Sequence, residues 1–309
     1  MAGRAVSDAL SSPTPMSATG PELSDLFAAF RRRLLAEPTL IEAGVADGLQ
    51  PGEARALLET YVNEAQVGLD LVAPLLRPGL RVLEVGCGIG ALARFLLDQG
   101  VDIVGIEPGS AGFGFMPAIG RAILDLAPAR KESWPAIRAE ALDPAVHGRF
   151  DVIFSVNVLE HIPDLEGALR GMANVLAPGG TMVHFCPNYA IPYEPHFGIP
   201  LLPIKPDLTR HLFPTTIARI PGLWGDLNFI TAQRVARVAR ALSLSAAFDR
   251  GALSSQLRRL ETDPQFRARH GTLARALGGV IRTLRLPDLL AAVPGQFVTP
   301  MIVRLTHTA

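Results

Sequence analysis

The feature that most constrains the fold is a set of three glycines directly after a short apolar segment. Residues 82–92 read VLEVGCGIGAL, so Gly86, Gly88 and Gly90 alternate with other residues where a buried strand would turn into a helix. Glycine admits positive φ and, having no Cβ, lets another molecule contact the backbone. A turn between strand and helix also points the free N–H groups of the helix start at whatever lies beside them. The spacing therefore predicts a strand–turn–helix unit that binds a ligand.

The rest of the chain alternates short apolar runs with segments of helical spacing. Two of the helical segments, ALARFLLDQG and LEGALRGMANVLAPGG, end in glycine, as helices often do. The runs that indicate strands are LRVLEVG, VDIVGIEPG, IRAEAL, FDVIFSV, TMVHFCPN, SAAFDR and QFVTPMIVRLTHT. Alternating strands and helices with short connections predict an α/β fold with a doubly wound, mostly parallel, seven-stranded Rossmann-like sheet.

Several segments lie outside this alternation. Residues 1–22 are small, polar and proline-containing, which predicts disorder. Residues 23–77 have helical spacing and predict N-terminal helices that cover the site, before a sheet domain over 78–309. The alternation breaks at about 189–230, which is dense in proline and aromatic residues, and again at about 252–292, which indicates inserted helices. We expect this helical and loop insertion to lie over the site.

Composition narrows the classes of function. The formal net charge is zero and hydrophobic residues make up 49% of the chain, which favours a globular protein and gives no support for a nucleic-acid partner. Cys87 and Cys186 are the only cysteines and form no CxxC motif, which excludes a disulfide framework and a cysteine-based zinc site. With no recognisable secretory signal and no long apolar run, the sequence predicts a cytoplasmic protein without a membrane span.

An acidic residue ends the strand that follows the glycine turn. Glu107 closes VDIVGIE, about twenty residues after the glycines, where a carboxylate can accept hydrogen bonds from both hydroxyls of a ribose. The glycines are spaced GxGxG, whereas dinucleotide sites commonly use GxGxxG. The combination predicts a nucleoside ligand and argues against a nicotinamide-dependent oxidoreductase, which remains an alternative.

At this point the chain resembles the class I S-adenosylmethionine-dependent methyltransferases. The resemblance covers roughly 78–188 and rests on five segments in order: VLEVGCGIG, IVGIEPG, AEAL, FDVIFSVNVLEHIPD and VLAPGGTMVHFCPN. The string LEHIPD is closest to the small-molecule branch that includes the ubiquinone-pathway O-methyltransferases. The resemblance implies that 78–309 is a methyltransferase domain and that its cofactor is S-adenosyl-L-methionine. A catalytically inactive binding module of the same fold is a second alternative.

The resemblance also implies which residues contact the cofactor. These are Gly86, Cys87, Gly88, Gly90, Glu107, Pro108, Glu140, Ala141 and Asn157. The glycine turn would hold the methionine moiety, Glu107 and Pro108 the ribose and the adenine face, and Asn157 would flank the sulfonium. Glu140 would accept from the adenine amino group while the N–H of Ala141 reaches a ring nitrogen. Glu140 as a surface acid and Cys87 as a small core residue are the alternative interpretations.

A hydroxyl acceptor would also need a group that removes its proton, and histidine suits that task near neutral pH. His161 in LEHIPD and His196 in YEPHF are the two candidates as catalytic base, ahead of His184 and His211. His161 could instead only shape its loop. Asn157, Glu160 and His161 could together contribute to a divalent-metal site, but one histidine and one carboxylate make a weak ligand set, so the sequence predicts no metal site.

The sequence gives less information about the acceptor than about the cofactor. Residues 231–288 hold eleven arginines against four acidic residues, which indicates either peripheral contact with an anionic membrane or ordinary solvated arginines on packed helices. The apolar segment PHFGIPLLPI favours a bulky hydrophobic acceptor. The sequence therefore predicts methyl transfer to a small or lipid-like molecule, with oxygen favoured as the receiving atom.

Overall fold

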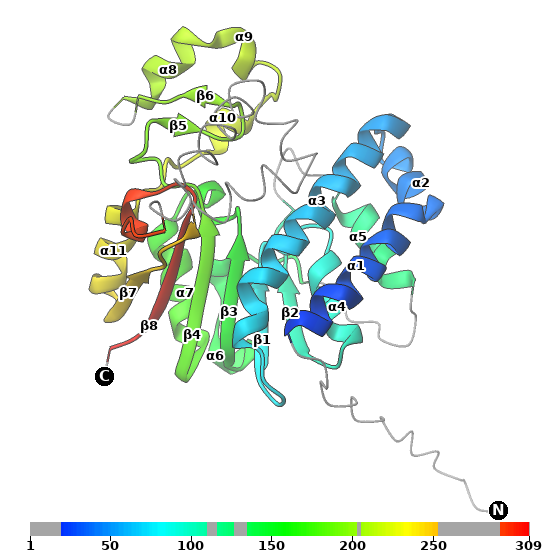
Figure 1. Ribbon diagram of the computed structural model, residues 1–309, viewed down its shortest axis with the longest axis horizontal. Coiled ribbons are helices and arrows are strands. Elements are labelled where there is room, and N and C mark those ends of the chain that lie inside the picture. The colour runs from blue at the N-terminus through cyan, green and yellow to red at the C-terminus, as the bar shows by residue number, and fades with distance from the viewer. Residues whose placement is uncertain (1–19, 110–115, 127–134, 203–204, 253–290, 309) are drawn as a thin grey trace, which may run out of the picture.

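A six-stranded sheet forms the centre of the computed structural model, in the order β2-β1-β3-β4-β8-β7 (Figure 1). The structure describes residues 20–109, 116–126, 135–202, 205–252 and 291–308. The strands are β1 (Arg81–Val85), β2 (Asp102–Ile106), β3 (Phe150–Val156), β4 (Leu176–Cys186), β7 (Leu244–Phe248) and β8 (Met301–His307). The first four pair in parallel, whereas β8 runs antiparallel to both β4 and β7. The predicted α/β, mostly parallel, Rossmann-like architecture is confirmed.

The predicted count of seven strands is wrong, because IRAEAL does not join the sheet. Its central residues form a 3₁₀ turn, η2 (Ala139–Ala141), that packs against helix α7 (Leu165–Val175). Ala139 and Leu142 are both buried in the cluster that includes α7. Beside β2 the N–H of Glu107 donates to the carbonyl of Pro135, two residues before this segment, at 3.2 Å, and the segment itself is not a strand of the sheet.

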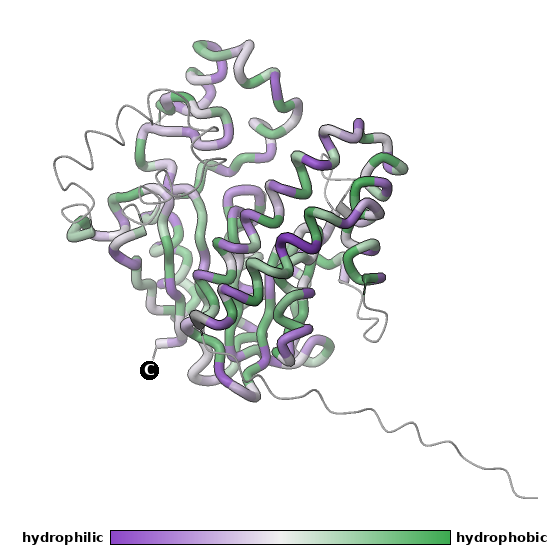
Figure 2. Tube along the Cα trace, turned by 45° about the vertical axis from the view of Figure 1, so that its right-hand side comes forward, coloured by the Kyte–Doolittle hydropathy of each residue, from purple (hydrophilic) through white to green (hydrophobic). Residues whose placement is uncertain are grey.

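Helices cover both faces of the sheet and make a three-layer molecule. One face carries the N-terminal helices with α4 and α5, and the other carries α7 and α11, each packed on its own apolar cluster. Figure 2 shows mostly hydrophobic strands inside and helices that alternate between hydrophobic and hydrophilic residues. The bounds are α1 (Gly20–Ala36), α2 (Pro38–Ala46), α3 (Pro51–Val72), η1 (Ala73–Leu75), α4 (Ala91–Asp98), α5 (Met116–Asp125), α6 (Pro144–His147) and α11 (Ala232–Ala241).

The N-terminal segment differs from expectation in two respects. Helix α1 begins at Gly20, so the predicted disorder of 1–22 is wrong for its last three residues, and 1–19 lie outside the described residues. Two prolines divide the helical region, Pro38 starting α2 and Pro51 starting α3. Proline is favoured at the first position of a helix because it needs no N–H partner there. Helix α3 packs on β3 and β4, α1 packs on α3, and α2 packs on α3 and α5.

The insertion begins at the carboxyl end of β4 and forms a separate lobe above the sheet (Figure 1). It contains a two-stranded hairpin and three short helices: β5 (Tyr193–Glu194), β6 (Ile199–Pro200), α8 (Pro206–Leu212), α9 (Pro214–Ile217) and α10 (Leu223–Asp226). The chain returns through α11 and β7, and a 3₁₀ turn, η4 (Gly295–Phe297), precedes β8. The expected inserted helices at 252–292, and most of the arginine-rich stretch 231–288, lie outside the described residues. Within the described residues, no helix combines the length and the apolar character that crossing a membrane requires.

Candidate active site

The glycine turn connects β1 to α4 at the carboxyl end of the parallel strands. Gly86, Gly88 and Gly90 all have positive φ, of 69°, 55° and 70°. A Cβ on Gly86 would overlap the side chain of Val158, which follows β3. The N–H of Gly86 donates to the carbonyl of Ile106 at 2.8 Å, which ties the turn to the end of β2. Gly86 is therefore required by its backbone angle and by its packing.

Glu107 follows β2 and lies beside the glycine turn. One of its carboxylate oxygens accepts from the N–H of Gly88 at 3.0 Å, and the other accepts from the N–H of Gly109 at 3.1 Å. A carboxylate offers about four acceptor positions, so Glu107 can accept further hydrogen bonds. Pro108 is exposed next to it. A turn with three glycines, whose Cys87 and Ile89 side chains are buried, beside such a carboxylate fits the amino-acid and ribose parts of S-adenosylmethionine.

Two other residues of this segment are buried beneath the turn. Cys87 is buried, and burial, followed by the negative charges of Glu84 and Glu107, raises the pKa of its thiol. Such a thiol stays neutral, in keeping with the alternative interpretation of Cys87 as a small core residue. Glu84 accepts from the N–H of Ala93 in the first turn of α4, and burial raises its pKa to about 8. Glu84 therefore supports the start of the helix that the turn leads into.

The predicted adenine contacts lie in the η2 turn. The N–H of Ala141 donates to the carbonyl of Arg138 at 3.0 Å, so this donor is already used within the turn. Glu140 is half-buried and lies close to Gly167 at the start of α7. The adenine-binding roles of Glu140 and Ala141 stay predictions.

Asn157 stands at the carboxyl end of β3 with a positive φ of 53°. Its N–H donates to the carbonyl of Phe185 at 2.8 Å, and its Nδ2 donates to Glu64 Oε1 of α3 at 3.3 Å. Tyr61 lies one turn before Glu64, and burial, followed by the charges of Glu64 and Glu107, raises its pKa. Helix α3 thus places Tyr61 and Glu64 at the same edge of the sheet as the glycine turn. No motif in the sequence marks either residue.

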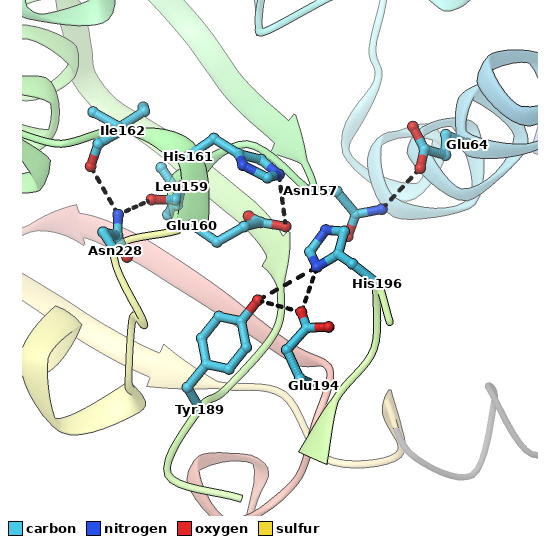
Figure 3. A network of polar contacts seen from close by, with 10 residues as sticks. All are labelled: Glu64, Asn157, Leu159, Glu160, His161, Ile162, Tyr189, Glu194, His196 and Asn228. Atoms are coloured by element: carbon cyan, nitrogen blue, oxygen red, sulfur yellow. Dashed lines mark hydrogen bonds and ion pairs between the residues drawn. The ribbon is translucent and has the colours of Figure 1, made fainter. Parts of the chain in front are cut away.

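A cluster of two histidines and a glutamate lies at this edge (Figure 3). Glu160 and His161 belong to the 3₁₀ turn η3 (Leu159–His161) after β3, and His196 lies between β5 and β6. The two imidazole rings are 5.3 Å apart between centroids, and Glu160 Oε1 lies 4.0 Å from His161 Nε2. The structure therefore brings together His161 and His196, the two predicted candidates as catalytic base.

The lobe fixes His196 through a second glutamate. Glu194 Oε1 lies 2.6 Å from His196 Nδ1 and accepts from the Tyr189 hydroxyl at 3.1 Å, while Oε2 accepts from the N–H of Phe197 at 2.7 Å. Glu194 is completely buried, and every one of these partners belongs to the lobe or to its first residues. Its polar neighbours therefore compensate the cost of burying it.

The lobe also holds the η3 turn. Asn228 Nδ2 donates to the carbonyls of Leu159 and Ile162, at 2.6 and 2.7 Å, and the N–H of Asn228 donates to the carbonyl of Glu160 at 2.8 Å. These three bonds bracket Glu160 and His161 from both sides. Asn228 and Tyr189 are residues that no sequence pattern indicates, because their roles come from contacts between distant segments.

Burial changes the proton affinities in the cluster in opposite directions. It raises the pKa of Glu160 to about 7 and lowers the pKa of His161 to about 4, where His196 contributes in the same direction. Burial also lowers the pKa of His196, but the hydrogen bond and the charge of Glu194 outweigh it, so the pKa of His196 is raised overall. The site thus holds one histidine that prefers to be neutral and one that prefers a proton.

The other two histidine candidates are placed differently. His184 is buried in β4, its Nδ1 lies 2.8 Å from the hydroxyl of Ser155, and burial lowers its pKa to about 4. It is a hydrogen-bonded core residue. His211 is exposed in α8. Arg234, in the described part of the arginine-rich stretch, donates to the carbonyl of Asn228 at 3.1 Å and so supports the lobe.

Comparison with known proteins identifies the class. A family model described as a methyltransferase domain matches residues 57–237, from within α3 to within α11. The chain belongs to this methyltransferase family. It is an S-adenosyl-L-methionine-dependent enzyme, as the glycine turn and Glu107 also indicate, and this decides against the nicotinamide-dependent alternative.

Individual relatives add detail. An uncharacterized protein of Mycobacterium tuberculosis (strain ATCC 25618 / H37Rv) is 38% identical over 236 residues, which are 74% of this chain and 79% of that protein. A ubiquinone biosynthesis O-methyltransferase of Acinetobacter baumannii (strain ACICU) is 32% identical over 102 residues, which are 33% of this chain and 41% of that enzyme. The solved structure of Haemonchus contortus phosphoethanolamine N-methyltransferase 2 with S-adenosyl-L-methionine aligns over 80% of this chain and 53% of that one, with 16% identity and a TM-score of 0.43.

Proposed function

We propose that the protein methylates an oxygen of a small or lipid-like molecule, and that the acceptor hydroxyl loses its proton at the pair His161 and His196. The observation that carries this proposal is the meeting of the two histidines at the sheet edge that also holds the glycine turn. Their side chains are 19% and 22% exposed, so an acceptor can reach them while most of each ring is screened from water.

The residues of this chain have distinct tasks in such a reaction. When bound, S-adenosyl-L-methionine supplies an electrophilic methyl group: an acceptor lone pair forms the new O–C bond, the S–C pair stays on sulfur, and the hydroxyl proton leaves. Glu107 and the backbone of the glycine turn bind and orient the nucleoside. Asn157 and α3 close the sheet edge beside it. Positioning of this kind accounts for much of the rate in group transfer.

Features of the lobe favour a bulky acceptor. It contains a pocket of about 630 Å³ whose lining includes Arg210, Ile217 and Trp224. The Trp224 ring lies 5.9 Å from the ring of Phe197, the neighbour of His196. The wall of this open pocket is largely apolar, which favours a hydrophobic molecule. The relative named as a ubiquinone biosynthesis O-methyltransferase agrees with oxygen as the receiving atom.

Calorimetry with S-adenosylhomocysteine tests the cofactor site. Glu107→Ala is expected to weaken binding by about 1.5–3 kcal/mol, the range for losing hydrogen bonds to a charged group. Glu166→Ala is the control, because Glu166 lies exposed on α7 and pairs with Arg170. Equal affinity of the wild type and Glu107→Ala would remove Glu107 from the site.

Matched acceptors test the receiving atom. Phenols and anilines of the same size and substitution are offered with S-adenosyl-L-methionine, and methylated products are measured by mass spectrometry. We expect methyl ethers from the phenols and at least tenfold less product from the anilines. Preferential methylation of the anilines would contradict the assignment to oxygen.

A further inference from the structure

We propose that Glu160, His161 and His196 bind a divalent transition-metal cation, which activates the acceptor oxygen. The proposal rests on the proposed function, because it assigns a chemistry to the histidine pair. Each of the three side chains offers one ligand atom, and these atoms all lie within 4.8 Å of one another. Within the part of the chain that the structure describes, this is the one such group of histidine, cysteine or acidic residues.

The surroundings of Glu160 are an independent indication of a cation site. The residue is completely buried, and among the described residues neither of its carboxylate oxygens has a hydrogen-bond partner. Its contact with His161 Nε2, at 4.0 Å, is too long for a hydrogen bond. Buried carboxylates are expensive unless they are paired, hydrogen-bonded or bound to a metal. A cation between Glu160 and the histidines would supply the absent partner.

Glu194 provides the arrangement that accompanies a metal-binding histidine. Its Oε1 accepts from His196 Nδ1 at 2.6 Å, which leaves Nε2 as the nitrogen that can bind a cation. Ligating histidines commonly donate their other nitrogen to a carboxylate, which fixes the ring and the tautomer. Glu194 is itself held by Tyr189 and Phe197. Of the two buried glutamates, one is thus fully engaged as a support and the other is left to be a ligand.

The donor set selects the kind of cation. Two imidazoles and one carboxylate suit zinc, cobalt, iron or manganese better than magnesium, which prefers oxygen ligands. Ligand distances of about 2.0–2.2 Å put neighbouring ligand atoms about 3–3.5 Å apart, so the group has to contract by about 1 Å. Because Glu194 holds His196 in place, a rotation of the partly exposed His161 ring toward Glu160 would supply most of this contraction.

Three protein ligands leave coordination positions open, as in catalytic zinc sites. The acceptor oxygen would take one of them. The cation then lowers the pKa of the bound hydroxyl, whose proton leaves to solvent water, and no oxidation or reduction is involved. In this arrangement the hydroxyl still loses its proton at the histidine pair, where His161 and His196 act by binding the cation and solvent water takes up the proton.

Metal binding to the full-length protein tests the site directly. Metal-free protein is prepared by dialysis against a chelator and titrated with Zn²⁺ by calorimetry, and with Co²⁺ by visible absorption. We expect one cation per chain and at least tenfold weaker binding of Mg²⁺. His196→Gln and Glu160→Gln should each weaken Zn²⁺ binding more than tenfold, and Glu194→Gln about 10–100-fold. His307→Gln, an exposed histidine at the end of β8, should bind as the wild type does.

The outcomes separate this proposal from the proposed function. Circular dichroism and thermal unfolding show which variants fold, and His196→Gln, at a partly exposed position, keeps the test valid if Glu160→Gln does not fold. No stoichiometric Zn²⁺ or Co²⁺ binding, or equal affinity in His196→Gln, would overturn the metal site. Methyl transfer that survives chelation but is lost in His196→Gln would overturn the cation and leave His196 as the base. Failure to bind S-adenosylhomocysteine would instead count against the proposed function.

Discussion

The strands β1 to β4 and the lobe of residues 189–230 are built on different kinds of contact. In the first region β1 pairs in parallel with both β2 and β3, and the glycine turn follows from backbone angles and backbone hydrogen bonds. In the lobe the two strands have two residues each, and buried polar side chains set its position: Asn188, Glu194 and Thr209. A site made by backbone leaves a motif in the sequence, whereas a site made by side chains from distant segments does not.

Gly86 gives the sharpest test of the backbone side of this comparison. Gly86→Val would place a β-branched residue at a φ of 69° and drive it into Val158, whose Cβ lies 3.1 Å from the added Cβ. Left-handed strain costs about 1–3 kcal/mol and overpacking about 1–3 kcal/mol, more for a whole residue in conflict. We expect a loss of about 4–6 kcal/mol in the free energy of unfolding, measured with urea, and loss of S-adenosylhomocysteine binding.

Gly79→Val is the matched control. Gly79 also has a positive φ, of 83°, but no atom lies within 4 Å of its added Cβ. Gly79→Val should therefore lower the free energy of unfolding only by the cost of the strained backbone angle, about 1–3 kcal/mol. Equal losses in the two variants would show that packing against Val158 contributes nothing, and the turn would then be less specific than its motif suggests.

Most of the first region is predictable from the sequence, because backbone angles and backbone hydrogen bonds set it locally. The strand-turn-helix unit, Glu107 beside it and Asn157 at the end of β3 are all placed by local pattern. The contacts of Glu107 and Asn157 with the cofactor stay predictions. The exception to placement by local pattern is IRAEAL, whose place in the alternation of strands and helices predicts a strand although its alanines and glutamate do not favour one. Its Ala139 and Leu142 are instead buried with α7, a tertiary contact that local propensity does not include.

Glu84 is a buried polar group in the sheet region, and it can be tested through the pH dependence of stability. The expected change in the free energy of unfolding is smaller than that for Gly86→Val. Burial raises the pKa of Glu84 from the ordinary 4.5 to about 8, the N–H of Ala93 opposes this and the charge of Glu107 adds to it. Between these two pH values the folded chain holds a proton that the unfolded chain has released. Stability therefore falls as pH rises through this window.

The expected result follows from comparing Glu84→Gln with the wild type. The variant cannot ionise, so between pH 5 and pH 8 the wild type should lose about 3–4 kcal/mol more in the free energy of unfolding, at 1.36 kcal/mol per pKa unit. Urea unfolding without cofactor at both pH values measures this. Glu166→Gln, at an exposed position, should follow the wild type. Parallel pH curves for Glu84→Gln and the wild type would contradict the raised pKa.

The lobe shows what sequence reasoning misses. His161 and His196 are each identifiable as candidates, but nothing in the sequence says that they meet, or that Glu160 lies between them without a hydrogen bond among the described residues. Their meeting depends on Asn228, which brackets η3 from a segment nearly seventy residues further along. Such contacts involve single side chains with no periodic signal, so only the folded chain reveals them.

Asn188 tests the side-chain half of the comparison and has the smallest expected effect. Its Nδ2 donates to the carbonyls of Gln296 and Val298, at 2.9 and 3.2 Å, and its Oδ1 accepts from the N–H of Ala190 and Ala232, at 3.3 and 3.2 Å. It therefore joins the start of the lobe to α11 and to the segment before β8. Asn188→Ala removes the partner of two buried backbone groups, the carbonyl of Val298 and the N–H of Ala232, while Ala190 and Gln296 are exposed. Leaving these two buried groups unpaired should cost about 2–3 kcal/mol.

The location of that loss decides whether the lobe is a separately held unit. Because the bonds of Asn188 join the lobe to its surroundings, hydrogen exchange in Asn188→Ala should speed up in residues 189–230 while β1 to β3 keep their protection. Asn174→Ala, at an exposed position of α7, is the control and should change neither. Faster exchange spread equally over the lobe and the parallel strands would mean that the two regions unfold together, and the distinction between a site made by backbone and one made by side chains would then not extend to stability.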